Sequence, residues 1–327
     1  MGDIATTESL GQQELEALVR MALDEATAQG VDQAEVAASH DLGLSTTARL
    51  GDVENLEYTN DRGLGITVYK NKCKGNASTS DISPDSIREA VLKACAFATY
   101  TAEDQHSGLA DADLMCTEVR NLDLDHAWPI DSADAIAMAI DCEKSGLEYD
   151  TRINNSEGAT VATNRSARAY GNSHGFVGSY TKSSHSMSCV VLAGNSGDMQ
   201  RDYYYSAARD PDDLESASYI GEKAARRTLS RLGAHKIKTT KTPVLFTPEL
   251  ARGFIGHAIG AIAGGAQYRR ASFLLDAVGE KIFPDFVSIL ERPHLAKGMS
   301  SAAYDGEGVA MTRHGGGNLA NCRKRKP

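Results

Sequence analysis

Hydrophobic residues recur at helical spacing in five stretches of this sequence. In each, apolar positions three and four residues apart form one stripe, which is typical of a helix with one buried face. Serine, threonine or proline at the start and glycine at the end favour helix limits near these stretches. The predicted helices cover residues 13–29, Ser83 to about Tyr100, Ala133–Ser145, about Asp212–Leu232, and Thr247 toward Gly265.

The last of these helices begins in a favourable way. Thr247 can cap it, and Pro248 suits the first turn, where a missing N–H is no loss. Its stripe is expected to be buried and consists of Leu250, Phe254, Ala258, Ile259 and Ile262. A short apolar run, Pro243–Phe246, is predicted to be a strand leading into it.

Elsewhere apolar and polar residues alternate, which indicates strands. Asn71-Lys72 and Asn195-Ser196-Gly197-Asp198 are turn sequences, so each predicts a hairpin. The predicted strands are 34–38, 42–50, Gly63–Tyr69, 73–79, Ser184–Ala193 and Met199–Ala207. Residues 271–282 and 284–291 carry mixed helix and strand patterns.

These elements predict an α+β fold with three parts: an N-terminal helix–sheet unit, a central β-rich unit and an incomplete β-rich C-terminal domain. The expected limits are 1–110, 117–235 and 236–310, with a polar, Asp-rich linker between the first two. Residues 311–327 have no apolar periodicity, three consecutive glycines and a basic end. We expect this tail to be disordered.

Composition narrows the class of protein. The chain has 327 residues, 41% hydrophobic and 24% charged, with a net charge of −10. The negative charge argues against sequence-independent binding to nucleic acid. No stretch reaches the roughly 18 apolar residues of a membrane span, and the acidic N-terminus lacks a signal peptide. Six scattered cysteines without a C-x-x-C pair are typical of reduced thiols. A cytoplasmic protein is therefore expected.

Candidate metal ligands are few. His257 stands alone on the last helix, because the positions one turn away are Gly253 and Ala261. A catalytic zinc needs about three protein ligands, so a packed, hydrogen-bonded histidine is the favoured interpretation. A second candidate set is His174, His185 and Cys189, the last two on one face of a predicted strand. A structural role is favoured there too.

Two further features stay open. The run Tyr203-Tyr204-Tyr205 is either a peptide-facing surface or, as is more common for aromatic residues in strands, part of the core. The four basic residues at 323–326 are a weak indication of nucleic-acid binding beside an acidic body.

Several longer motifs together resemble a known family. The chain is similar to the PmbA (TldE) branch of the TldD/PmbA family over roughly residues 10–310. The matching runs include Gly171–Cys189, Gly197–Tyr205, Ala225–Leu232, Gly256–Gly279, Ile289–Ser301 and Tyr304–Val309. The similarity ends near Ala310, so a C-terminally truncated member is expected.

The resemblance has a specific implication for chemistry. TldD-type members carry His-Glu-x-x-x-His on the equivalent helix and are zinc peptidases. Aligning that motif places Arg252 and Gly253 at the first His and the Glu, and only His257 remains. PmbA-type members also lack the zinc motif and pair with a TldD-type subunit.

The resemblance therefore implies a subunit of an intracellular zinc metalloprotease that acts on unfolded or leader peptides. No catalytic, metal-binding or cofactor-binding residue is expected on this chain, and zinc is expected on the TldD-type partner of a heterodimer. The alternative is a peptide-binding or regulatory module with no protease role. Neither nucleic acid nor a membrane is an expected partner.

Overall fold

The computed structural model describes residues 11–195, 197–284 and 286–312. These fall into two compact units, residues 11–234 with 293–312 and residues 235–292. Each unit is described by itself. Helices and an antiparallel sheet occur together in the first unit, which confirms the predicted α+β class.

One six-stranded antiparallel sheet forms the centre of the first unit. Its order is β3-β2-β1-β4-β5-β6, with β1 paired to β4 from Glu35↔Asn172 to Ala48↔Ala159. Strands from both sides of the predicted linker, residues 103–116, thus share one sheet. The strands are β1 (Gln33–Arg49), β2 (Asp52–Lys70), β3 (Cys73–Thr79), β4 (Ile153–Asn172), β5 (Val177–Ala193) and β6 (Gln200–Ala208).

The predictions for three strands, β1, β2 and β5, were too short. The stretches 34–38 and 42–50 are one strand, β1, because the intervening His40 is buried and hydrogen-bonds Asn60 across to β2 (2.7 Å). A polar residue there interrupts the apolar alternation without ending the strand. The first half of β2 was missed for a different reason. Its side chains are mostly exposed, so no apolar alternation marks it.

Four predicted helices are confirmed in this unit, as α1 (Gln12–Ala28), α2 (Pro84–Ala98), α3 (Ser132–Leu147) and α4 (Ala217–Leu229). Side-chain caps fix three of their starts: Ser83 accepts from Ser86 N–H, Asp131 from Asp134 and Ser216 from Tyr219. The last helix starts later than predicted, because Pro211–Asp213 forms a separate 3₁₀ turn.

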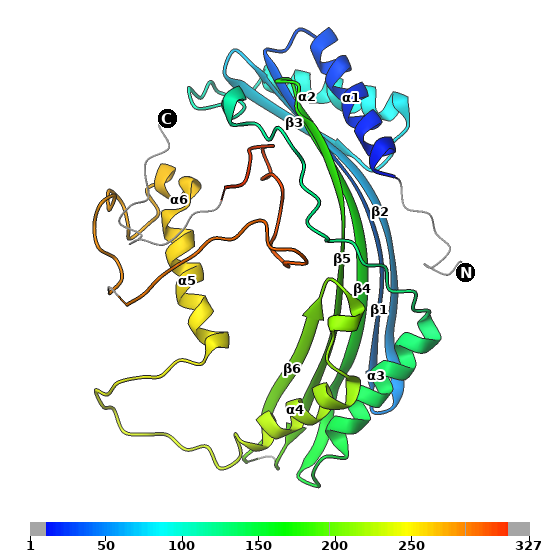
Figure 1. Ribbon diagram of the computed structural model, residues 1–327, viewed down its shortest axis with the longest axis vertical. Coiled ribbons are helices and arrows are strands. Elements are labelled where there is room, and N and C mark those ends of the chain that lie inside the picture. The colour runs from blue at the N-terminus through cyan, green and yellow to red at the C-terminus, as the bar shows by residue number, and fades with distance from the viewer. Residues whose placement is uncertain (1–10, 196, 285, 313–327) are drawn as a thin grey trace. The chain divides into compact units, whose positions relative to one another are not determined.

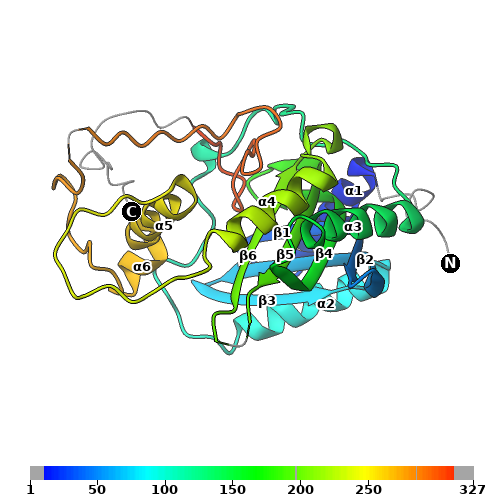
Figure 2. The ribbon, with the colours of Figure 1, turned by 90° about the horizontal axis from the view of Figure 1, so that it is seen from below.

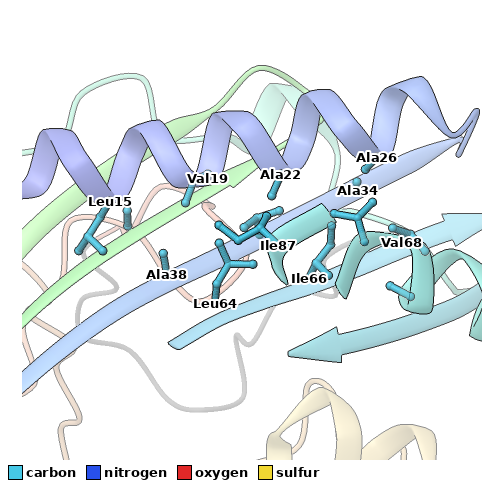
Figure 3. Packing of buried hydrophobic residues seen from close by; sticks show 14 of the residues in the cluster. Leu15, Val19, Ala22, Ala26, Ala34, Ala38, Leu64, Ile66, Val68 and Ile87 are labelled. Atoms are coloured by element: carbon cyan, nitrogen blue, oxygen red, sulfur yellow. The ribbon is translucent and has the colours of Figure 1, made fainter. Parts of the chain in front are cut away.

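All four helices pack on one face of the sheet, in two pairs. Helices α1 and α2 cover one end and α3 and α4 the other, and Figure 1 shows α1, α2 and α3 on the outer side of the bowed strands. Figure 3 shows Leu15, Val19, Ala22 and Ala26 of α1 directed toward the strands. Each of these four side chains is fully buried, so most of the apolar burial of this unit lies on this helix-covered face.

Two glycines let helices approach closely. A Cβ at Gly75 of β3 would overlap the Ala94 carbonyl of α2, and one at Gly221 of α4 would overlap the Cys142 carbonyl of α3. Figure 2 shows α3 and α4 side by side, in agreement with their many contacts. Larger residues at these positions would push the elements apart.

The second unit contains α5 (Pro248–Ile262) and α6 (Gly264–Tyr268). The strand predicted at Pro243–Phe246 is wrong, since this run is irregular and Leu245 is 96% exposed. Burial of the stripe on α5 was also predicted wrongly for Leu250, Phe254 and Ile259, which are 51–65% exposed. Helical spacing gave the helix, but the contact of the Phe246 ring with Phe254 (centroids 4.7 Å apart) still leaves these side chains more than half exposed.

The remaining predictions concern the end of the chain. Between 271 and 291 the described residues form turns and irregular chain, with neither helix nor strand. The tail predicted to be disordered falls almost entirely on residues 313–327, which lie outside the described part.

Candidate functional site

Helix α5 carries the three positions that the family motif singles out. Thr247 is its N-cap residue and Pro248 stands at its first position, as predicted. Arg252 and His257 are five residues apart, so they point about 140° apart around a regular helix. His257 is exposed, which contradicts the expectation of a packed histidine. Of the four positions one turn away from His257 on its own helix, Gly253, Gly260 and Ala261 carry little or no side chain, and only Phe254 is large.

A hollow of about 450 Å³ lies beside His257. Its lining consists of Gly256, His257, Gly260, Ala261, Ala271, Ser272 and Phe273. The Ser272 hydroxyl already donates to the Ala261 carbonyl (2.7 Å), so it closes the loop back onto the helix.

These residues do not fit a catalytic zinc. Such a site needs about three nitrogen, sulfur or carboxylate ligands, and the hollow offers His257 alone. Arg252 is cationic and Gly253 has no side chain. Across residues 11–312, apart from 196 and 285, no three His, Cys, Asp or Glu side chains are grouped so that they could hold a metal.

The second candidate set is not brought together. His174 lies in the exposed turn after β4, whereas His185 lies eight residues beyond the start of β5, about 26 Å along the strand at 3.3 Å per residue. Both ring nitrogens of His185 are engaged, Nδ1 with Thr163 Oγ1 (2.9 Å) and Nε2 with the His126 carbonyl (2.8 Å). Its role is therefore structural, as the sequence favoured.

Burial also affects the protonation of His185 and Cys189. Desolvation lowers the pKa of His185. The pKa of the Cys189 thiol is raised by its hydrogen bond with Cys142 and by burial. A neutral thiol is a poor metal ligand.

The opposite face of the sheet is polar, and we call it the open face because none of the described helices of the first unit packs on it. Ser39, Asp41, Arg168, Tyr180 and Lys182 belong to it. Arg168 donates through Nη2 to both carboxylate oxygens of Asp41 (2.9 and 3.0 Å) and through Nε to the Ser166 hydroxyl (2.9 Å). The strands thus present charged and hydrogen-bonding groups on this side.

A cavity of about 720 Å³ lies on the open face. Small residues form its floor, among them Gly63, Gly65 and Ser39, and a Cβ at Gly65 would meet nothing within 4 Å. Arg168 and Tyr180 line its wall. This volume is typical of pockets that hold a small ligand or a few residues of a peptide.

Residues 302–306 form the other wall of this cavity. Tyr304 is buried there between Phe176 and Tyr180, with ring centroids 5.1 and 5.7 Å away, and donates to the Gly178 carbonyl (2.9 Å). Burial raises the pKa of the Tyr304 phenol, so the group stays a neutral donor. Sequence reasoning missed this cavity, although small residues at alternate positions of β2, Gly63 and Gly65, marked its floor.

The tyrosine run divides between the two faces. Tyr204 packs against the core under α3 and α4, whereas Tyr203 and Tyr205 are 46% and 42% exposed and stack with centroids 6.3 Å apart. The core interpretation is therefore confirmed for Tyr204, whereas a peptide-facing role of the exposed pair stays a prediction.

Comparisons with known proteins agree with the motifs. Models of PmbA/TldA metallopeptidase domains match residues 34–98 (domain 1), 125–232 (central domain) and 239–314 (C-terminal domain). Metalloprotease PmbA of Escherichia coli O157:H7 is 44% identical over 299 residues, 91% of this chain and 66% of that protein. The chain belongs to the PmbA/TldD family. The PmbA homolog of Haemophilus influenzae is 45% identical, with 91% of this chain and 66% of the relative aligned.

Solved structures of similar fold include a candidate modulator of DNA gyrase from Bacteroides thetaiotaomicron. It superposes with a TM-score of 0.87 at 25% identity, over 94% of this chain and 70% of that chain. TldE from Thermococcus kodakarensis gives 0.71 at 17% identity, over 93% and 67%. The second likeness concerns the fold alone.

This PmbA/TldD family member spans about two thirds of the length of the curated relatives that it matches. Among the helices in the described part of the chain, none combines the length and the apolar character needed to cross a membrane.

Proposed function

We propose that this chain is a PmbA/TldE-type subunit of a TldD/TldE metalloprotease, that it holds the peptide substrate, and that a TldD-type partner carries the catalytic zinc. Unfolded or leader peptides are the substrate class. The heterodimer is proposed to act in the cytoplasm. We also propose that the chain divides into domains at 1–110, 117–235 and 236–310.

One observation carries the non-catalytic role. The positions of the zinc motif are Arg252 and Gly253, and the hollow beside His257 contains no second ligand. A water cannot be activated there, because both the metal and a carboxylate base would be missing. Hydrolysis would then depend on a partner that supplies both.

The open face supports the peptide-holding role. Its cavity has the size for several residues, a floor of small residues that leaves the strand backbone approachable, and aromatic walls. Extended peptides are commonly bound by pockets beside strands, where the backbone provides affinity and the pockets provide selectivity.

The test uses the 327-residue chain with an affinity tag and a TldD-type family member produced in the same cells. The two should co-purify, with zinc near one per pair and cleavage of an unfolded peptide by the pair alone. Zinc near one per chain together with peptidase activity of the isolated chain would contradict the proposal. Restoring the motif by Arg252→His and Gly253→Glu tests whether these two positions limit metal binding.

The second candidate is a peptide-binding or regulatory module outside any protease. The exposed pair Tyr203 and Tyr205 and the open-face cavity favour peptide binding by themselves. Peptide binding without recovery of a TldD-type partner would select this second function.

A further inference from the structure

A group of cations stands beside the cavity on the open face. Lys182 of β5 lies in one row with Ser166 of β4 and Asp41 of β1, by the strand registers. Arg168 lies diagonally across from Lys182, within reach of long side chains. The third cation, Arg209, follows the end of β6 directly.

The carboxylate in this row is already engaged. Asp41 binds Arg168 through both oxygens and lies two strands away from Lys182, about 9.6 Å between backbones at 4.8 Å per strand. The Lys182 ammonium is only half-buried and stands 5.9 Å from the Tyr180 ring centroid. No hydrogen bond or ion pair of this ammonium occurs among the described residues.

Arg209 is the more unusual group, because it is a buried cation without a carboxylate. Its side chain is 5% exposed, and its two Nη atoms donate to the carbonyls of Ser183 and Met299. Its Nε–H is buried and has no partner within the described part of the chain. A buried charge that is not neutralised is costly, which favours a counter-ion.

The two arginines act on Lys182. Desolvation by burial lowers the pKa of Lys182 most, and the charges of Arg168 and Arg209 lower it further. Desolvation also lowers the pKa of Arg209. With Asp41 balancing one of three positive charges, two remain on this part of the open face.

The neighbouring carboxylate does not fill this role. Asp210 adjoins Arg209 in sequence but binds Lys297 (2.6 Å) and lies 3.3 Å from His126. The Asp210 carboxylate is thus engaged by Lys297 of the 297–299 segment and by His126. The backbone carbonyl of His126 in turn bonds His185 of the helix-covered face.

We propose that Lys182 and Arg209 form a binding site for a carboxylate of the bound peptide, beside the open-face cavity. The inference deepens the proposed peptide-holding function and rests on it. Tyr180 connects the two features, since it lines the cavity and its ring lies next to the Lys182 ammonium. The carboxylate comes from the peptide C-terminus or from an Asp or Glu side chain.

The peptide test compares three fluorescein-labelled hexapeptides of alanine and serine. One has a free C-terminal carboxylate, one a C-terminal amide, and one an amide with an internal glutamate. A charge-assisted contact predicts about tenfold tighter binding of a carboxylate-bearing peptide than of the neutral amide. Fluorescence anisotropy with the full chain measures the three dissociation constants.

Variants assign the effect to this site. Lys182→Met should remove the tenfold difference and Lys182→Arg should retain most of it, because the charge is kept. Lys144→Met, at an exposed position of α3, is the matched control and should behave as the unchanged chain. Equal binding of all three peptides, or a difference that survives Lys182→Met, would overturn the proposal.

A second experiment tests the carboxylate site without any peptide. Replacing chloride by acetate at constant ionic strength should raise the Tm of the unchanged chain and of Lys144→Met by a few degrees, and leave that of Lys182→Met unchanged. If no peptide binds but acetate stabilises through Lys182, the peptide-holding function fails and the carboxylate site stands. If acetate has no Lys182-dependent effect, the site is refuted.

Discussion

The two faces of the central sheet are made from the same strands but differ in what they contact. On the helix-covered face, Met187, Cys189 and Val191 of β5 are fully buried under α3 and α4. On the open face, the alternate residues Ser184, Ser186 and Ser188 are only partly buried. One strand thus contributes stability through one set of side chains and leaves the other set available for binding.

The largest expected difference between the faces comes from truncating a core side chain. Met187→Ala should lower the free energy of unfolding by about 3 kcal/mol, because it removes buried apolar surface and leaves a cavity. Ser186→Ala, one residue away on the open face, should change it by less than about 0.5 kcal/mol. Urea unfolding of both variants measures the contrast, and equal losses would show that the open face is also core.

A glycine pair gives the next contrast. Gly221→Ala should cost about 2 kcal/mol, because the new Cβ overlaps the Cys142 carbonyl where α4 meets α3. Gly65→Ala on the open face meets open space and should be neutral or stabilising by about 0.5 kcal/mol. The change in thermal midpoint tests both. A loss on Gly65→Ala would mean that the cavity floor is packed.

A buried carboxylate holds the end of the sheet. Glu143 of α3 accepts from the backbone N–H groups of Leu50 (2.8 Å) and Gly51 (3.0 Å), in the β1–β2 turn. Glu143→Gln keeps one acceptor and leaves one N–H unsatisfied, so about 1 to 2 kcal/mol should be lost. The exposed Glu89→Gln is the control, with an expected change below about 0.5 kcal/mol. Hydrogen exchange at Gly51 would report the released turn.

The smallest effect concerns pH on the helix-covered face. The native pKa of His185 is lowered by burial, so the unfolded state takes up a proton first as pH falls. The stabilisation is full above the unfolded pKa of about 6.5 and is lost progressively as pH falls toward the native pKa.

His185→Gln should remove that pH dependence, and His174→Gln in the exposed turn should retain it. Urea midpoints at pH 7.5 and 5.5 provide the measurement. A pH dependence that is equal in both variants would mean that other groups cause it.

Local pattern predicted the helices of the first unit well. Helix α2 follows from Ser83, Pro84 and one apolar stripe, and the structure has it within two residues. Strand prediction failed where alternation was absent, as in the first half of β2, which pairing with β1 holds extended. The predicted domain limits stay a prediction, although β1 and β4 share a sheet.

The site was predictable only in part. The assignment of Arg252 and Gly253 to the positions of the zinc motif needs only the sequence, and it stays a prediction. The open-face cavity could not be predicted, because its floor and walls come from five strands and the 302–306 segment. Lys182 and Arg209 lie 27 residues apart, and nothing in their local sequence indicates that both charges face one place.

By itself, the sequence determined the family and the helical stripes, because residue identity and short-range spacing decide these. Tertiary structure alone decided which stripes are covered: that of α1 is buried, whereas Leu250 and Phe254 on α5 are 65% and 51% exposed. It also decided which charges meet on the open face. Burial and long-range charge depend on strand pairing between distant residues, and spacing along the chain does not encode that pairing.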